Sequence, residues 1–173
     1  MSTVVGINNG GEIWLGSDGM ATTAEGERRN VICNKIFENG DYLFGFVGSV
    51  RIGQLLTPHH FEPPSDIRDL PDEILMHLKE RDCVAYSSET SVSLLESNML
   101  IATSSGKLYE ILSDFQLNEV VKYTAIGSGS YFACGSLHTT RNQKNADKRI
   151  MKALHAASEF DTSTGPPYTV QKY

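Results

Sequence analysis

The sequence has no cysteine pair and no long apolar run, and each absence excludes a class of protein. Its three cysteines, Cys33, Cys83 and Cys134, lie far apart and lack the paired spacing of a zinc site or a redox dithiol. We therefore expect free thiols in a reducing compartment. The first twelve residues show no basic segment followed by an apolar one, and no stretch approaches the roughly 18 apolar residues of a membrane span. These features predict a cytoplasmic protein with no membrane partner.

Positive charge is also scarce. Fifteen lysine and arginine residues against twenty-one aspartate and glutamate residues give a formal net charge of -6. The basic residues are spread thinly, except at Arg28-Arg29 and around residues 141–149. A nucleic-acid-binding protein usually carries a basic stripe, so the sequence disfavours nucleic acid as a partner.

Motifs of several enzyme classes are missing. The glycines around Ser49 and Ser128 do not form a Gly-x-Ser-x-Gly elbow. Gly106-Lys107 lacks the glycine five positions earlier that a phosphate-binding loop needs, and the five histidines show no metal-ligand spacing. The sequence therefore predicts no cofactor and no metal. A Ser-His-Asp hydrolase stays open, but no serine and histidine are marked for it by their context.

The length and the hydrophobic pattern favour one α+β domain over residues 1–173. A chain of 173 residues with 40% hydrophobic and 21% charged residues is typical of a single folded domain. The Asn-Gly pair at 9–10 predicts a tight hairpin, and apolar residues at helical spacing predict the helices. We expect Asp69 to cap the second helix with Pro71 in its first turn, and Asn145 to open the last one. We expect strands at 3–7, 13–15, 35–37, 42–47, 92–95, 99–103, 107–112, 123–126 and 168–170, and helices at 50–56, 69–83, 131–137 and 145–160. Runs of strands followed by paired helices indicate a layered sandwich rather than an alternating parallel sheet.

One candidate nucleophile needs no histidine. If Met1 is removed, Ser2 becomes the first residue and carries both a hydroxyl and a free α-amine. That amine can act as the base, directly or through a water, because its ordinary pKa of about 8 suits proton uptake at neutral pH. Serine at position 2 is common, so this interpretation depends on its context.

Six segments supply that context, because in order and content they resemble motifs of proteasome β-subunits and of the bacterial HslV peptidase. They are STVV at 2–5, GSDGMAT at 16–22, NKI at 34–36, GFVGS at 45–49, GSGSY at 127–131 and DTSTG at 161–165. The sixteen-residue step from Ser2 to Asp18 also matches the step from the family's nucleophile to its first aspartate. The resemblance implies an N-terminal-nucleophile hydrolase fold, a four-layer αββα sandwich with the N-terminus in a cleft between two sheets.

The resemblance also implies roles for individual residues. Ser2 matches the nucleophile, which is threonine in most of the family. Lys35 matches the lysine whose charge lowers the pKa of the hydroxyl and the amine, and Asp18 matches the aspartate that pairs with it. Gly48 matches the glycine whose backbone amide forms the oxyanion hole.

A second set of matches surrounds the N-terminal amine and the substrate. Ser128 matches the serine near that amine, and Asp161 and Thr164 match the aspartate and serine that complete its hydrogen-bond network. For substrate binding the matches are Thr22, which binds the substrate backbone, Phe46, which lines the pocket for the residue before the cleaved bond, and Gly129 in the loop after Ser128. A structural cation at the 161–165 turn stays open.

The resemblance implies a peptidase that hydrolyses unfolded proteins or peptides inside a double ring formed by self-association. Because the chain lacks a phosphate-binding loop, an ATP-dependent unfoldase would be a separate partner. Two alternatives stay open: a small-molecule amidase or peptide ligase that uses the same nucleophile, and a ring subunit that has lost catalysis. The segment after Gly48 departs from the family, because Pro58 breaks a helix that is longer in the relatives.

Overall fold

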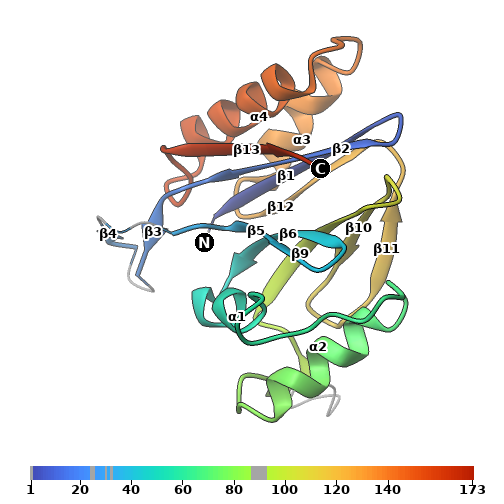
Figure 1. The fold of residues 1–173 in the computed structure, drawn as a ribbon. Helices are drawn as coiled ribbons and strands as arrows, with labels where there is room; N and C mark the ends of the chain where they lie inside the picture. Colours follow the sequence, from blue (N-terminus) through green and yellow to red (C-terminus); the bar gives the residue numbers. More distant parts are fainter. Residues whose placement is uncertain (1, 24–25, 30, 32, 87–92) are drawn as a thin grey trace.

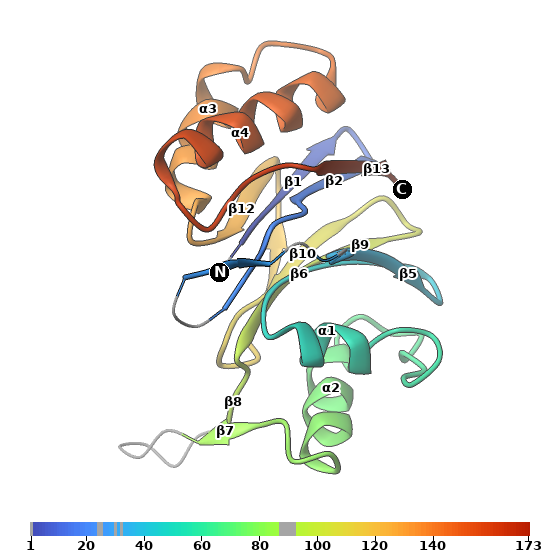
Figure 2. The ribbon, with the colours of Figure 1, turned by 90° about the vertical axis from the view of Figure 1, so that its left-hand side faces the viewer.

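Two β-sheets lie face to face, and a pair of helices covers the outer face of each (Figures 1 and 2). The computed structural model of the chain describes residues 2–23, 26–29, 31, 33–86 and 93–173. Figure 2 shows the four layers in turn, from α3 and α4 through the two sheets to α1 and α2. The predicted four-layer αββα sandwich is confirmed.

The first sheet contains both the N-terminal and the C-terminal strand. Its order is β12-β1-β2-β13, and all its pairs are antiparallel. The strands are β1 (Thr3–Asn9), β2 (Glu12–Asp18), β12 (Tyr123–Gly127) and β13 (Tyr168–Lys172). The predicted hairpin joins β1 to β2, with Gly10 and Gly11 at φ values of 71° and 95° that side chains rarely adopt. Because β1 has a neighbour on each side, the residue that precedes it is held in a fixed position.

The second sheet has the order β11-β10-β9-β6-β5. Its strands are β5 (Ile36–Asn39), β6 (Tyr42–Gly48), β9 (Ser97–Thr103), β10 (Leu108–Ile111) and β11 (Leu117–Val120). Strand β11 was not predicted, because its four residues are too few to show a period and it pairs only with β10 at the edge of the sheet.

Two short ribbons lie outside the main sheets. One pairs β3 (Ala21–Thr22) with β4 (Arg28–Arg29), and the other pairs β7 (Ala85–Tyr86) with β8 (Ser93–Leu94). Figure 2 shows the second ribbon beside the lower part of α2. It contains part of the strand predicted at 92–95, of which Val92 lies outside the described residues.

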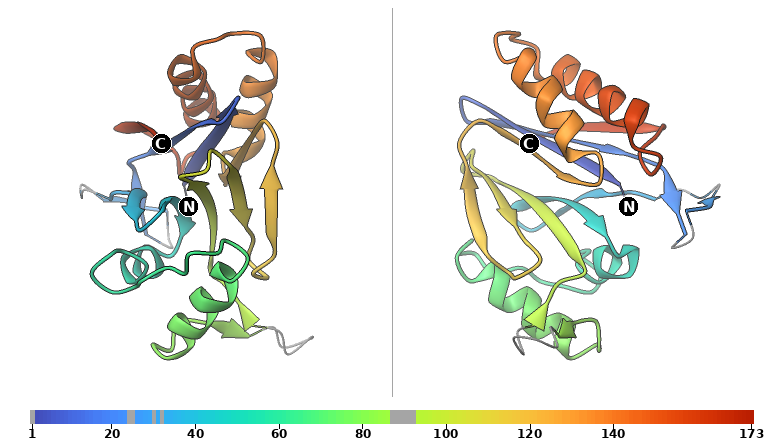
Figure 3. Two further views of the ribbon diagram at one scale, coloured as in Figure 1. Left: turned by 45° about the vertical axis from the view of Figure 1, so that its right-hand side comes forward. Right: turned by 180° about the vertical axis from the view of Figure 1, so that it is seen from behind.

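Each pair of helices covers one sheet. The helices are α1 (Val50–Leu55) and α2 (Leu70–Lys79) over the five-stranded sheet, and α3 (Ser130–Thr139) and α4 (Ala146–Phe160) over the four-stranded sheet (Figure 3). As predicted, α4 begins after Asn145, whose side chain accepts a hydrogen bond from the Lys148 N–H at 2.8 Å. No helix within the described residues is both long and apolar enough to cross a membrane.

The helix predicted at 69–83 differs from the observed α2 at both ends. It ends at Lys79, because Asp82 takes a left-handed backbone conformation with φ 52° and the chain turns there. Asp69 lies at the predicted cap position, but its backbone is helical and its side chain makes no capping hydrogen bond. The predicted proline in the first turn, Pro71, is confirmed.

Three apolar cores separate the four layers. One lies between α3/α4 and the first sheet and includes Ile150 and Leu154. A second lies between the sheets around Leu15 and Leu43, and a third packs Phe44 and other side chains of the second sheet against α1 and α2. Because each interface is filled, the sheets are held at a fixed separation, and the site described below lies at one end of the space between them.

Candidate active site

Ser2 lies at the start of β1 and is held by both strands that flank it. Its side chain is buried, and its carbonyl oxygen accepts a hydrogen bond from the Ser128 N–H at 3.0 Å. Gly127 makes this contact feasible, because its φ is 98° and a Cβ atom there would lie 1.9 Å from the Ser2 carbonyl oxygen. The glycine at the end of β12 therefore sets how closely the chain can approach Ser2.

On the other side of β1, the hairpin brings Asp18 next to the residue that follows Ser2. The register pairs Val4 with Ser17, so Asp18 lies opposite Thr3, and its Oδ1 accepts the Thr3 N–H at 2.9 Å. The sixteen-residue step from Ser2 to Asp18 is thus the length of one strand out, a tight turn and one strand back.

Lys35 reaches this carboxylate from the other sheet. It immediately precedes β5, and its Nζ donates to Asp18 Oδ1 at 2.8 Å and to the Met20 carbonyl at 2.8 Å. Asp18 and Lys35 are 0% and 3% exposed, so the pair is removed from water. The Met20 and Gly165 N–H groups donate to the second carboxylate oxygen, at 3.1 and 3.4 Å. A buried ion pair with this many hydrogen bonds is a rigid, charged support for Thr3, the residue that follows Ser2.

A second carboxylate lies on the side of Ser128. Asp161 follows α4, and its Oδ2 accepts the Ser128 hydroxyl at 2.7 Å and the Thr164 hydroxyl at 2.5 Å. The Thr164 and Thr3 hydroxyl oxygens are 2.6 Å apart. Because Thr164 donates its proton to Asp161, Thr3 must be the donor to Thr164.

The environment of Asp161 favours its charged form. Burial raises the pKa of this carboxyl, but hydrogen bonds from Thr164, Ser128 and the Ser163 backbone outweigh burial, and the net pKa lies below its ordinary value. Asp161 is therefore a carboxylate at neutral pH, and it orients the hydroxyls that surround the start of β1.

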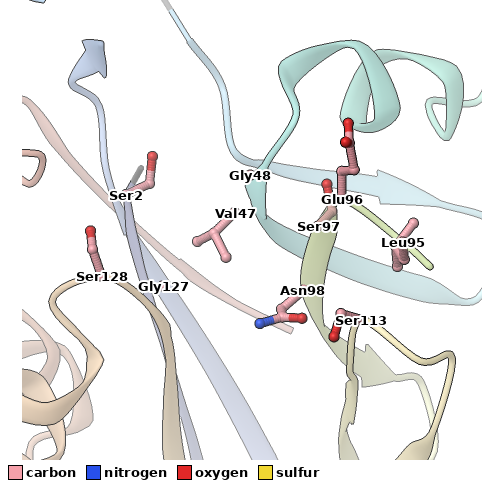
Figure 4. A pocket seen from close by; sticks show the side chains of 10 residues that line it. All are labelled: Ser2, Val47, Gly48, Leu95, Glu96, Ser97, Asn98, Ser113, Gly127 and Ser128. Atoms are coloured by element: carbon pink, nitrogen blue, oxygen red, sulfur yellow. The ribbon is translucent and has the colours of Figure 1, made fainter. Parts of the chain in front are cut away.

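A cavity of about 340 Å³ opens beside Ser2 (Figure 4). Ser2 and Ser128 lie on one wall, the segment from Leu95 to Asn98 lies on the opposite wall, and Gly48 lies between them. Gly48 has φ 103°, and a Cβ atom there would lie 2.3 Å from the Glu96 carbonyl oxygen. Only glycine therefore allows the end of β6 to lie this close to the Glu96 backbone, which forms part of the cavity wall.

The structure brings the seven predicted catalytic residues together near the start of β1. They are Ser2, Asp18, Lys35, Gly48, Ser128, Asp161 and Thr164. Their roles in catalysis stay predictions. Within the described residues, no three histidine, cysteine, aspartate or glutamate side chains cluster closely enough to hold a metal ion.

The three predicted substrate-binding residues do not line the cavity beside Ser2. Thr22 lies on β3, and Phe46 lines a separate cavity of about 330 Å³ together with Cys33 and residues of α1. Gly129 packs beneath the hydroxyl network, because a Cβ atom there would lie 2.4 Å from Thr3 Oγ1. Phe46 faces α1 because β6 alternates, so that Val47 points toward Ser2 instead.

Thr3 is the residue of this site that the sequence did not indicate. It is 0% exposed, its N–H binds Asp18, and its hydroxyl lies against Thr164. Thr3 thus links the Asp18–Lys35 pair to the Asp161 network. A polar residue next to the candidate nucleophile in an otherwise apolar strand was the available signal.

Comparisons with known proteins agree with this architecture. The sequence matches no protein-family model and no curated protein. Among solved structures, BPH from Thiobacillus denitrificans has a TM-score of 0.81 at 24% identity, over 99% of this chain and 97% of that chain. BPH in complex with epoxomicin has a TM-score of 0.81 at 22% identity, with coverage of 99% and 97%. Eukaryotic HslV from Trypanosoma brucei has a TM-score of 0.70 at 19% identity, with coverage of 98% of both chains.

These similarities extend over the whole chain. The protein has the fold of BPH and HslV. The resemblance that the six sequence motifs indicated is confirmed at the level of the fold.

Proposed function

We propose that the protein is an N-terminal-nucleophile peptidase in which Ser2, exposed as the first residue by removal of Met1, attacks peptide bonds. The observation that carries this proposal is the double support of the start of β1. Asp18 and Lys35 lie on one side of it, Ser128 and Asp161 lie on the other, and Ser2 lines a cavity. A structural strand end needs neither a buried ion pair nor a hydroxyl network.

The reaction follows from these groups. The Ser2 α-amine takes the hydroxyl proton, directly or through a water, as Oγ forms a bond to the substrate carbonyl carbon. The buried Lys35 charge favours this step, because it lowers the pKa values of the nearby hydroxyl and amine. The oxyanion that develops faces the backbone at Gly48, whose N–H would donate to it.

The acyl-enzyme then forms and is hydrolysed. The carbon–nitrogen bond of the substrate breaks, and the amine passes its proton to the leaving group. Water next attacks the ester and releases the Ser2 hydroxyl. Ser128, Asp161 and Thr164 hold the α-amine side of the site in place through both steps.

For the substrate we propose peptides or unfolded proteins. Thr22 lies in the short strand β3, which could add an extended peptide as a further strand. The residue before the cleaved bond would enter the cavity that Phe46 lines, and the cavity beside Ser2 would accept the chain after that bond.

Self-association into stacked rings is part of this proposal. On the outer helical layer, Tyr131 and Phe160 are 88% and 68% exposed, and the Phe132 and Phe160 rings contact each other with centroids 5.1 Å apart. Large aromatic side chains at the surface are typical of interfaces. A separate ATP-dependent unfoldase would unfold folded substrates and supply the unfolded chains to the ring.

Degradation of β-casein tests the proposed function. We expect the wild-type protein to cleave casein and Ser2→Ala to be inactive, with native mass spectrometry showing the same ring in both. Hydrolysis of short amides but not of casein would indicate an amidase rather than a peptidase. An intact ring that is inactive on both substrates would indicate a scaffold subunit.

A further inference from the structure

A second polar cavity lies at the opposite end of the first sheet from Ser2. It has a volume of about 570 Å³ and is lined by the turn after β1, the start of β12 and the end of α3 with the loop that follows. Strand β1 separates the two places, and at about 3.3 Å per residue the six steps from Ser2 to Asn8 span about 20 Å. The volume falls within the range of roughly 300–1,000 Å³ found for small-molecule sites.

The charge of this cavity is one-sided. Its lining includes Lys122, Arg141 and Arg149, together with Tyr123 and His138, and none of its lining residues is an aspartate or glutamate. The chain as a whole has a formal net charge of -6, so this positive cluster is not a consequence of composition. It includes Arg141 and Arg149, the first and last of the basic residues around 141–149 that stood out in the sequence.

Arg149 is the unusual member of the cluster, because it is buried without a counter-charge. It lies on α4 and is 6% exposed, and its guanidinium carbon is 5.7 Å from the centroid of the Tyr123 ring. One long hydrogen bond joins its Nη2 to the Leu137 carbonyl at 3.4 Å, and its Nε has no partner. No ion pair within the described part of the chain includes Arg149.

A buried guanidinium without a counter-charge is unfavourable. Burial lowers the pKa of Arg149, and the phenol of Tyr123 opposes this effect only in part. Arginine nevertheless stays protonated at neutral pH, so the charge persists in a site that desolvates it. A bound anion would remove this unfavourable state.

The two exposed basic residues of the cavity are also available to bind an anion. Neither Lys122 nor Arg141 takes part in an ion pair among the residues that the structure describes, although Arg141 donates to the His138 carbonyl at 2.9 Å. Three positive charges around one cavity suit a ligand with more than one negative charge. A planar guanidinium also matches the oxygens of a phosphate group with two parallel hydrogen bonds.

We propose that this cavity binds a phosphate-type oxyanion, either as inorganic phosphate or as the phosphate group of a small ester. Arg149 binds the anion from the buried side, and Lys122 and Arg141 bind it from the solvent side. The remaining volume holds the organic part of an ester. The site is independent of the peptidase activity proposed for Ser2.

Calorimetric titration of the full chain tests this proposal. Inorganic phosphate and adenosine monophosphate are titrated in chloride buffer at constant ionic strength. We expect saturable binding of at least one probe. Exchanging both exposed basic residues, Lys122→Gln with Arg141→Gln, should weaken binding by at least about tenfold, because two charge-assisted hydrogen bonds to the anion are lost. Arg149→Met should abolish it.

The control is Lys79→Gln, which removes an exposed positive charge at the end of α2, far from the cavity. Its affinity should equal that of the wild type. Tighter binding of the nucleotide identifies an ester, and tighter binding of phosphate identifies the free anion. If the Arg149 variant does not fold, the double variant at Lys122 and Arg141 still tests whether this cavity binds the anion.

Three results would overturn the proposal. One is the lack of saturable heat with both probes, and another is an unchanged affinity in the double variant. The third is a changed oligomeric state of the double variant without a change in phosphate binding, which would indicate that the cavity binds a carboxylate of a neighbouring copy. Neither readout depends on peptide hydrolysis.

Discussion

Exchange of Asp18 for asparagine should affect stability and activity in separable ways. Asp18 and Lys35 are 0% and 3% exposed, and Asp18 Oδ1 accepts both Lys35 Nζ and the Thr3 N–H. Asp18→Asn leaves the Lys35 ammonium buried without a counter-charge, and removal of one partner of such a pair costs about 3–5 kcal/mol. For a chain of this size, about 2–4 °C per kcal/mol predicts a fall in Tm of roughly 6–20 °C.

The double variant Asp18→Asn with Lys35→Met separates the two effects. Methionine fills a similar volume without a charge, so most of the lost stability should return, while hydrolysis of casein should stay absent in both single variants and in the double variant. Stability is measured by urea denaturation and thermal unfolding. If Asp18→Asn changed the free energy of unfolding by less than about 1 kcal/mol, or if Lys35→Met gave no recovery, the pair would not be the buried support that we describe.

Three further changes test the surroundings of Ser2. Gly127→Ala should unfold the start of β1 and abolish hydrolysis, because the alanine Cβ would lie 1.9 Å from the Ser2 carbonyl oxygen. A variant that is stable by circular dichroism and active on casein would contradict this prediction. Thr164→Val should reduce kcat more than it raises KM, because it breaks the chain of hydroxyl groups from Thr3 to Asp161. Thr164→Ser keeps the hydroxyl and should keep near wild-type rates. Equal rates of the two variants would show that the network takes no part in the mechanism. The folded-state pKa of Asp161 is lowered, so its contribution to stability is present above the unfolded pKa of about 3.9 and is lost as the pH falls through the folded pKa. The stability difference between wild type and Asp161→Asn in urea should therefore be constant from pH 5 to 7 and shrink below about pH 4, and a difference independent of pH down to 3 would refute it.

Much of the fold was predictable, because its strongest signals are local. The Asn-Gly turn fixes the register of the first hairpin, and that register places Asp18 beside Thr3. The apolar stripe of α4 and its Asn145 cap gave that helix within one residue of its observed bounds. Strand β11 and the two-residue strands β3, β4 and β7 were missed because their pairing depends on partners in space rather than on a periodic pattern, whereas β8 lies within the strand predicted at 92–95.

The site was predictable in part for a related reason. The motifs named the residues that converge on Ser2, but they carry no information on which face of β6 each side chain occupies. Phe46 and Val47 are neighbours in the sequence, yet they line different cavities because strand side chains alternate. Thr3 was missed because its role depends on two partners, Asp18 and Thr164, that only the folded sheet brings to it.

The most direct test of the central claim is the intact mass of the purified protein before and after incubation with a peptide epoxyketone. This reagent needs a hydroxyl and a free amine on the same first residue. We expect loss of Met1 and one adduct per chain, with no adduct on Ser2→Ala. Retention of Met1, or its loss without an adduct, would contradict the assignment of Ser2 as an activated N-terminal nucleophile.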